Sequence, residues 1–260
     1  IMDAVNITDK LLNSLHYTVG FTPPPENILF KISGETIGSE GNFIVLSGLP
    51  KSGKSLFTMA ALASANSNKT IFGLSLNTLP NRPMIGYFDT ESGVSDFYKN
   101  LDSIRRFGLN ELSSNLNAFR TRTESAANNR VLIEHYIKYY PSSIIVIDGL
   151  LDIISNFNDE KESRFIIEWL KRITSEYNVL IIGVIHTGKK DGFTLGHYGS
   201  MLDRYAQSVL EVTKDFEFKL FRLSHKHLRS SAGFDDICIQ YTMNGVQECH
   251  APPPKKEGRR

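Results

Sequence analysis

The sequence predicts an α/β fold in which helices flank a mainly parallel central sheet, with an antiparallel extension at one edge. Between residues 43 and 185, short apolar segments alternate with longer segments of helical spacing. Such an alternation is typical of a parallel sheet that is covered on both faces. After residue 204, strand-like segments follow one another without helices between them, which indicates antiparallel pairing.

The predicted elements follow in order along the chain. Short apolar runs predict buried strands at residues 43–46, 84–88, 144–147 and 179–185. Helical spacing predicts helices at residues 55–65, 94–107, 126–139 and 162–177. The apolar face of the last helix carries Phe165, Ile166, Trp169, Leu170 and Ile173. The later strands are expected at residues 208–212, 216–223 and 235–241.

Length and composition favour one large domain with short appendages. The chain has 260 residues, of which 41% are hydrophobic. We expect a helix and a Pro-rich linker over residues 1–26, the α/β domain over residues 27–249, and a disordered basic tail over residues 250–260. The 29 basic and 28 acidic residues nearly cancel, so net charge alone does not indicate a nucleic-acid partner.

The expected compartment follows from three features of the sequence. Cys238 and Cys249 are the only cysteines, which excludes a disulfide framework of several bridges. No apolar run reaches the roughly 18 residues that cross a bilayer, and the first residues do not resemble a secretory signal. We therefore expect a cytoplasmic protein without a membrane partner.

The strongest motif is the segment GLPKSGKS, which runs from Gly48 to Ser55 directly after the first predicted strand. Glycines let such a loop curl so that backbone N–H groups point inward, and the following helix adds the positive end of its dipole. In this P-loop, Lys54 would reach the β- and γ-phosphates of ATP and the Ser55 hydroxyl would bind Mg²⁺. The expected nucleotide-binding residues are Gly48, Pro50, Lys51, Ser52, Gly53, Lys54, Ser55 and Leu56.

Carboxylates follow two of the other predicted strands. Asp148 ends the strand at 144–147 and would hold Mg²⁺, although Asp is also a common turn residue. Asp89 and Glu91 follow the strand at 84–88. The longer side chain of Glu91 would reach over the γ-phosphate as a base for water, or it is simply an acid at a helix N-terminus. Asp89 would cap the loop or the next helix.

The strand at 179–185 also leads into polar residues, His186 and Thr187. Polar groups at the carboxyl edge of a parallel sheet face the ligand crevice. Either residue could therefore sense the γ-phosphate. A hydrogen-bonded structural histidine is the alternative interpretation.

These strand ends together resemble those of RecA-type P-loop ATPases, in particular the RepA-like branch of hexameric replicative helicases from plasmids, phages and mobile elements. The resemblance extends from about residue 34 to residue 241 and rests on GNFIVLSG at 41–48, YFDTE at 87–91, IVIDG at 145–149 and VIHT at 184–187. The AAA+ and ABC branches place a catalytic Glu beside the metal-holding Asp, where this sequence has Gly149. The resemblance implies a RecA-like P-loop NTPase fold, with Lys54 and Ser55 as the P-loop pair, Asp148 as the metal-holding acid, Glu91 as the catalytic base and His186 as the sensor.

The resemblance further implies two DNA-facing loops, at residues 152–162 and 188–200. The loop 188–200 is Gly-rich and carries Lys189, Lys190 and His197, which suit contact with the phosphates of single-stranded DNA. Phe193 or Tyr198 could stack on bases. The loop 152–162 is acidic and therefore a poor phosphate binder. Both segments could instead be ordinary mobile loops.

Related helicases and recombinases often complete each active site with Lys and Arg from the neighbouring subunit. The segment SHKHLR at 224–229, expected after a strand, resembles that arrangement and offers Lys226 and Arg229, although its spacing differs from the usual Lys-x-Arg form. A trans-acting Arg would stabilise the transition state only in an assembled ring. An exposed basic hairpin is the alternative.

The expected function is that of an Mg²⁺-dependent ATPase that assembles as a ring, expected to be a hexamer. It would act on single-stranded DNA as a helicase or translocase in the replication or mobilisation of a mobile element, with replication or mobilisation proteins as candidate partners. Two alternatives use the same fold. One is an ATP-switched module that assembles on or recruits a transposase, primase or relaxase, and the other is a recombinase or recombination mediator.

Overall fold

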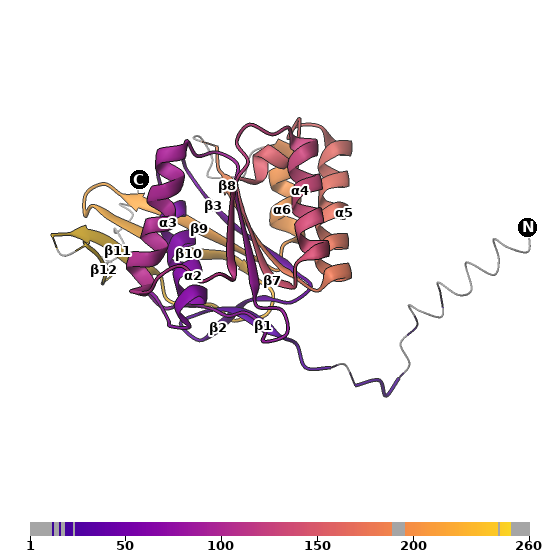
Figure 1. Cartoon of the computed structure of the whole chain (residues 1–260), viewed down its shortest axis with the longest axis horizontal. Coiled ribbons are helices and arrows are strands. Elements are labelled where there is room, and N and C mark those ends of the chain that lie inside the picture. Colours follow the sequence, from indigo (N-terminus) through magenta and orange to yellow (C-terminus); the bar gives the residue numbers. More distant parts are fainter. Residues whose placement is uncertain are drawn as a thin grey trace, which may run out of the picture.

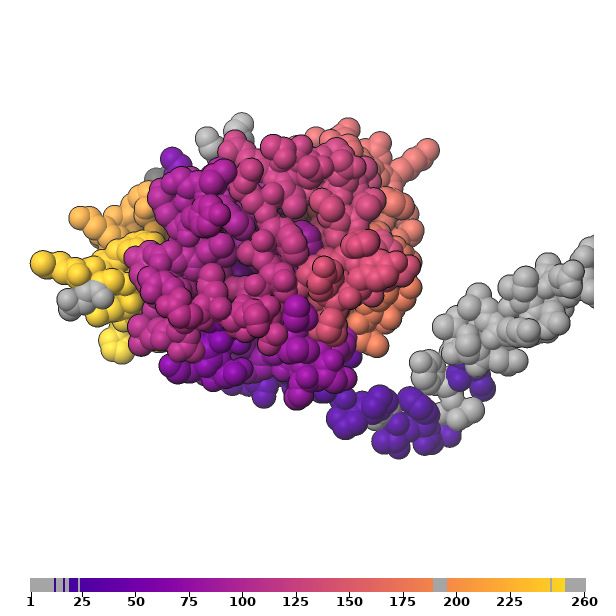
Figure 2. All heavy atoms as spheres, viewed as in Figure 1, coloured from indigo at the N-terminus to yellow at the C-terminus, as the bar shows by residue number. Residues whose placement is uncertain are grey.

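The computed structural model describes residues 12, 16, 19–22, 24–188, 196–243 and 245–250. The predicted tail, apart from His250, and most of the predicted N-terminal helix lie outside these residues. The described residues between 19 and 27 are exposed, and Figure 2 shows this indigo segment leaving the lower edge of the domain. Every helix of the described part of the chain is too short or too polar to cross a lipid bilayer.

Nine strands of the described residues form one sheet, in the order β12-β11-β10-β9-β3-β8-β7-β5-β6. The strands from β9 to β6 in that order pair in parallel, and β10, β11 and β12 continue the sheet antiparallel. The predicted mainly parallel sheet with an antiparallel extension is therefore confirmed. The strands are β3 (Phe43–Gly48), β5 (Met84–Asp89), β6 (Leu116–Arg120), β7 (Ser142–Asp148), β8 (Leu180–His186), β9 (Ser208–Asp215), β10 (Leu220–Leu228), β11 (Ile237–Thr242) and β12 (Gly245–Cys249).

Helices cover both faces of this sheet, as Figure 1 shows. On one face, α2 (Lys54–Ser67) and α3 (Val94–Gly108) pack together and contribute to one apolar core. On the other face, α4 (Ala126–Tyr139), α5 (Glu160–Tyr177) and α6 (Gly196–Tyr205) contribute to a second core. A 3₁₀ turn, η1 (Leu150–Ile153), follows β7. The central strands are buried on both faces because a helical layer lies on each side.

A second, small sheet was not expected from the sequence. Its antiparallel strands are β2 (Glu35–Ser39), β1 (Ile28–Ile32) and β4 (Leu74–Leu76), in the order β2-β1-β4. Its apolar side chains belong to the same core as α2 and α3. The small sheet therefore closes the α2 side of the domain.

The strand predicted at 216–223 begins later than expected. Residues 216–219 form a turn between β9 and β10, in which the Asp215 carboxylate accepts hydrogen bonds from the backbone N–H groups of Glu217 (2.9 Å) and Phe218 (3.1 Å). Lys219 adopts a left-handed backbone with φ of 53°. An Asx-type turn replaces the start of the strand because the short carboxylate satisfies the backbone donors locally.

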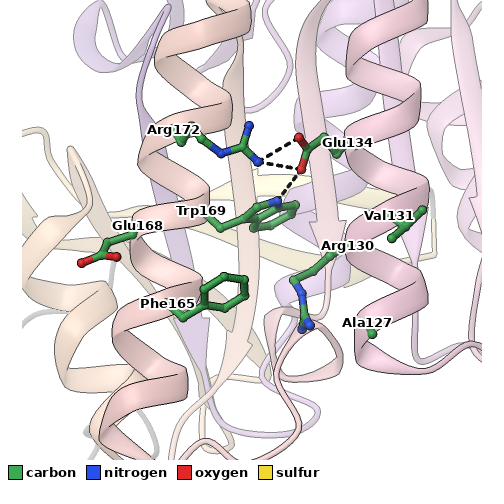
Figure 3. Close-up of a pocket in the computed structure, with 8 residues that line it drawn as sticks. All are labelled: Ala127, Arg130, Val131, Glu134, Phe165, Glu168, Trp169 and Arg172. Carbon is green, nitrogen blue, oxygen red and sulfur yellow. Dashed lines mark hydrogen bonds and ion pairs between the residues drawn. The ribbon is translucent and has the colours of Figure 1, made fainter. Parts of the chain in front are cut away.

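Phe165 is not part of the core face of α5, which corrects the predicted apolar face. Its side chain is 53% exposed, whereas Trp169 is 6% exposed. Figure 3 shows both rings at a groove between α4 and α5, and the Arg130 guanidinium lies 5.6 Å from the centre of the Phe165 ring. The aliphatic and cationic parts of Arg130 thus cover an aromatic ring that helical spacing alone places in the core.

Candidate active site

The four predicted strand ends meet at one edge of the sheet. The strands β3, β8, β7 and β5 are direct neighbours in that order. In the parallel registers, Gly48 lies opposite His186, and Asp148 lies opposite Asp89. Because carboxyl ends of parallel strands share an edge, residues separated by more than a hundred positions come together here.

The P-loop connects β3 to α2, and Gly53 fixes its geometry. Gly53 has φ of 102°, in the left-handed region, and its carbonyl accepts the N–H groups of Leu56 (3.0 Å) and Phe57 (3.2 Å). A Cβ added to Gly53 would lie 2.5 Å from Cδ1 of Phe221. Glycine is required here both by the backbone conformation and by the ring of Phe221.

Lys54, the first residue of α2, is buried within this loop. Its Nζ donates hydrogen bonds to the carbonyl oxygens of Gly48 and Leu49, both at 2.9 Å, and lies 3.0 Å from Nδ1 of His186. Burial lowers the pKa of Lys54 to about 8, while the nearby charges of Asp148 and Glu91 oppose that shift. The ammonium group is therefore charged at neutral pH and is poorly hydrated, which suits a ligand that carries negative charge.

His186 connects Lys54 to Glu91. Its Nε2 lies 3.1 Å from Oε2 of Glu91. An ammonium group can only donate hydrogen bonds, so Nδ1 must accept from Lys54 and Nε2 must carry the proton that is donated to Glu91. The hydrogen bond from His186, together with the positive charge of Lys54, lowers the pKa of Glu91 despite its partial burial. Glu91 is therefore an ionised carboxylate at neutral pH.

Asp148 is a buried carboxyl group at the end of β7. Burial raises its pKa to about 7, and the negative charges of Asp89 and Glu91 act in the same direction. A divalent cation stabilises the ionised form of such a group. Ser55 is exposed and lines the same hollow as Asp148. Hydroxyl and carboxylate oxygens are ligands that Mg²⁺ accepts, so this pair of residues fits the expected metal.

Asp89 caps the loop after β5, which is one of its two expected roles. Its Oδ1 accepts from the backbone N–H groups of Glu91 (3.1 Å) and Ser92 (2.7 Å), and the Tyr87 hydroxyl donates to its Oδ2 at 3.1 Å. The residue that caps α3 is Gly93 instead. Asp89 therefore holds the backbone of Glu91 in place.

Thr90 and Gly149 make contacts with the predicted acids and their neighbours that were not predicted from the sequence. The Thr90 hydroxyl accepts from the Gly149 N–H group at 2.7 Å and donates to the Asp152 carboxylate at 2.7 Å. A Cβ added to Gly149 would lie 2.4 Å from Oε1 of Glu91. Gly149 thus leaves the space that the Glu91 side chain occupies. The only sequence signal for Thr90 is its place between Asp89 and Glu91.

Thr187 lies apart from this constellation. Its backbone N–H group donates to the Gly48 carbonyl at 3.1 Å, and Thr187 lines a different hollow, which the P-loop shares with β9. Of these two polar residues, His186, the last residue of β8, is the one that contacts the candidate site.

The positions of Lys226 and Arg229 differ from the expected arrangement. Lys226 lies within β10 rather than after a strand, and its Nζ is 3.0 Å from Oε1 of Glu211. Arg229 directly follows β10, and its guanidinium donates to the Arg204 carbonyl. Since Leu228 pairs with Ser208 at the start of β9, Arg229 lies at the sheet edge opposite the P-loop. Its action on a neighbouring subunit stays a prediction.

The candidate DNA loops are only partly described. Lys189, Lys190 and Phe193 lie outside the described residues, and His197 is exposed at the start of α6. Tyr198 is completely buried in the core beneath α6, so its predicted stacking on bases is wrong. The loop 152–162 is structured, because the Glu162 carboxylate accepts from the N–H groups of Ser155 (2.8 Å) and Asn156 (2.9 Å).

Comparison with known proteins places this geometry in a family. Residues 21–192 match the AAA domain family. The structure is similar to that of a KaiC-like protein from the hyperthermophilic archaeon Pyrococcus horikoshii OT3, with a TM-score of 0.56 and 14% sequence identity, over 82% of this chain and 91% of that chain. A search of curated proteins found no match. At this identity the similarity concerns the fold alone, and it confirms the predicted RecA-like fold.

Proposed function

This chain belongs to the AAA domain family, and on that premise we propose that its RecA-type P-loop ATPase domain hydrolyses ATP with Mg²⁺ and acts on single-stranded DNA. The observation that carries the hydrolytic part is the hydrogen-bonded series Lys54–His186–Glu91, which joins the P-loop to the carboxylate that follows β5. This series places a cation, a neutral imidazole and an ionised base around one hollow.

Glu91 is the proposed catalytic base. It is partly exposed, so water can reach it, and the hydrogen bond from His186 orients its carboxylate. Glu91 would accept the proton of the water that attacks the γ-phosphate, while Lys54 would neutralise the charge of the phosphate oxygens. Mg²⁺, held by Ser55 and Asp148, would supply further charge neutralisation. The P-loop residues from Gly48 to Leu56 would provide the remaining phosphate contacts.

His186 is the proposed sensor of the γ-phosphate. Lys54 donates to two loop carbonyls and approaches His186 in this structure. A lysine that turns toward the β- and γ-phosphates would release Nδ1 of His186, which changes the hydrogen bonding at the end of β8. The loop 188–200 begins two residues further on, so hydrolysis could alter the position of that loop.

Three further parts of the proposal rest on the resemblance to RepA-like hexameric helicases. Lys189, Lys190 and His197 would contact DNA phosphates. Lys226 and Arg229 would act on the site of the neighbouring subunit in a ring. The chain would then serve as a helicase or translocase in replication or mobilisation of a mobile element.

Steady-state hydrolysis with and without single-stranded DNA tests this proposal. We expect DNA to stimulate the wild type several-fold, Lys54→Ala to lose nucleotide binding, and Glu91→Gln to bind ATP without hydrolysing it. The double variant Lys189→Ala/Lys190→Ala should keep basal hydrolysis and lose the stimulation. A wild type that hydrolyses ATP slowly and does not respond to DNA would contradict a motor function.

An ATP-switched assembly module is the second candidate. The acidic loop 152–162 and the near-neutral net charge favour it, because four acidic residues outnumber Lys161 in that loop and would repel DNA phosphates. ATP-dependent assembly or capture of a transposase, primase or relaxase should then survive Glu91→Gln. Loss of assembly together with hydrolysis in that variant would exclude the switch.

A recombination mediator, the third candidate, would instead show ATP-dependent strand exchange.

A further inference from the structure

The hollow beside the P-loop has two chemically different ends. Its volume is about 270 Å³. Glu91, Asp148 and His186 lie at one end, and Leu56, Phe221 and Tyr241 line the rest of the wall beyond Lys54 and Ser55. The first end is polar and charged, whereas the second carries two aromatic rings.

The polarity of a bound nucleotide follows from these ends. A base for the attacking water and a metal-holding acid must lie at the γ-phosphate, which assigns the γ-phosphate to the end with Glu91 and Asp148. The first turn of α2, with Ser55 and Leu56, then faces the phosphates nearer the sugar. The nucleoside must extend from there toward Phe221 and Tyr241. This step rests on the proposed function.

We propose that Tyr241 binds the base of the nucleotide by stacking and that Phe221 holds Tyr241 in position. The Tyr241 side chain is 65% exposed, while Phe221 is 9% exposed. The two rings are 5.8 Å apart between centroids with an interplanar angle of 84°. Phe221 thus supports the Tyr241 ring edge to face, a favourable aromatic geometry.

The antiparallel extension fixes both rings relative to the P-loop. Phe221 on β10 lies opposite Ile239 on β11, so Tyr241, two residues further along β11, is its diagonal neighbour. Tyr241 in turn lies opposite Val246 on β12. Phe221 also packs against Gly53, where an added Cβ would lie 2.5 Å from its ring. A short series of contacts therefore connects the P-loop to the proposed base-stacking site, which consists of Tyr241 supported by Phe221. This pair of rings is called the shelf below.

A second exposed aromatic residue provides a rival position. Phe216 is 80% exposed and lines the hollow that the P-loop shares with β9, together with Leu49, Pro50 and Lys214. Among the described residues, Ser55, Asp148 and Glu91 line the hollow of Tyr241 and not that of Phe216. Phosphates bound by Lys54 and Ser55 therefore lead toward Tyr241.

The chemical class of the ligand follows from the shelf. A tyrosine face recognises the area of a base and not its exocyclic groups, because every base has a π-face. We expect a purine nucleoside triphosphate, with ATP and GTP bound at similar affinity and pyrimidine nucleotides bound more weakly.

Calorimetric titration of the full chain with MgATP and with inorganic tripolyphosphate plus Mg²⁺ tests the shelf. Tyr241→Ala should weaken MgATP binding by about tenfold, since stacking on an aromatic side chain contributes at that level. The same variant should bind tripolyphosphate as the wild type does, because that ligand has no base. Tyr241→Phe should retain the affinity for MgATP, and Phe216→Ala should leave both ligands unaffected.

Each other result overturns the shelf. If Tyr241→Ala binds MgATP normally, or if Phe216→Ala loses it, the base lies elsewhere. Equal losses for MgATP and tripolyphosphate would show that Tyr241 supports the phosphate loop instead. The proposed function fails separately: a wild type that binds MgATP through Tyr241 but does not hydrolyse it keeps the shelf and loses the ATPase.

Discussion

At the scale of single residues, the Thr90 hydroxyl joins two strand ends that carry the candidate chemistry. Thr90 is buried, its N–H group donates to the Asp148 carbonyl at 2.7 Å, and its hydroxyl contacts Gly149 and Asp152. A buried hydroxyl with two partners leaves both unsatisfied when it is removed. Thr90 therefore positions Glu91 on one side and Asp148 on the other, although it is not among the residues that line the hollow beside the P-loop.

Thr90→Val keeps the shape of the side chain and removes its hydroxyl. We expect the free energy of unfolding to fall by about 1–3 kcal/mol, because the Gly149 N–H group and the Asp152 carboxylate lose a buried partner. The rate of hydrolysis should fall more than the affinity for MgATP, since the variant disturbs the base and the metal ligand rather than the P-loop. Thr90→Ser retains the hydroxyl and should behave like the wild type in urea unfolding and in kcat. Wild-type kcat in Thr90→Val would exclude a positioning role.

At the scale of elements, one carboxylate couples α4 to α5. The Trp169 indole N–H group donates to Oε2 of Glu134 at 2.8 Å, and the Arg172 guanidinium contacts both oxygens of Glu134 at 2.8 Å (Figure 3). Trp169 is buried at the base of the groove, whereas Arg172 is exposed. The indole contact therefore contributes more to stability than the ion pair, which water screens.

Glu134→Ala should lower the free energy of unfolding by about 1–2 kcal/mol, because the buried indole N–H group of Trp169 loses its acceptor. Trp169 is the only tryptophan of the chain, so its fluorescence reports both the lost contact and the urea transition. Glu168 lines the same groove, so Glu168→Ala serves as the matched control, for which we expect little change in the free energy of unfolding. A Glu134→Ala protein as stable as the control would show that the two helices are held by apolar packing alone.

Element boundaries were predictable wherever a continuous apolar run ended in a polar residue. The strand ends at Asp148 and His186 agree with the sequence for this reason, and the helix at 126–139 agrees because its apolar residues have helical spacing. Strand β6, at the sheet edge, is only half-buried and carries no continuous apolar run, so its pattern gave no signal. Segment 216–219 is apolar enough for a strand, but a local turn at Asp215 replaces the pairing.

The candidate site was predictable only in part, because sequence order reveals strand ends but not contacts between them. Lys54 could be found from the P-loop motif, and Glu91, Asp148 and His186 could be found because each follows an apolar run. The roles of Thr90 and Gly149 depend on contacts across β5 and β7. Tyr241 depends on the register of the antiparallel extension, and a shift of one residue would place it on the other face of the sheet.

At the scale of the whole molecule, the position of Arg229 determines whether one chain can complete its own site. Near the P-loop, Ser47 of β3 lies opposite Glu211 of β9. Leu228 of β10 lies opposite Ser208, which is three residues earlier along β9. Strand β10 therefore ends, and Arg229 lies, at the sheet edge away from the P-loop. Its guanidinium contacts the Arg204 carbonyl on the surface of its own subunit. If Arg229 takes part in hydrolysis, it must do so at the site of another subunit, which makes activity a property of the assembly.

Mixing two inactive proteins tests this prediction. An Arg229→Ala subunit keeps Glu91 in its own ATP site, and a Glu91→Gln subunit keeps the Arg229 that it offers to its neighbour. In a mixed ring, an Arg229→Ala site beside a Glu91→Gln subunit therefore has both groups. With random assembly of equal amounts, about a quarter of the sites should be complete, and hydrolysis should recover to about that fraction of the wild-type rate. Lys54→Ala mixed with Glu91→Gln should stay inactive, because both changes fall in the same site. A mixture of Arg229→Ala and Glu91→Gln that co-assembles in light scattering without recovering hydrolysis would assign Arg229 to the contact with Arg204 alone.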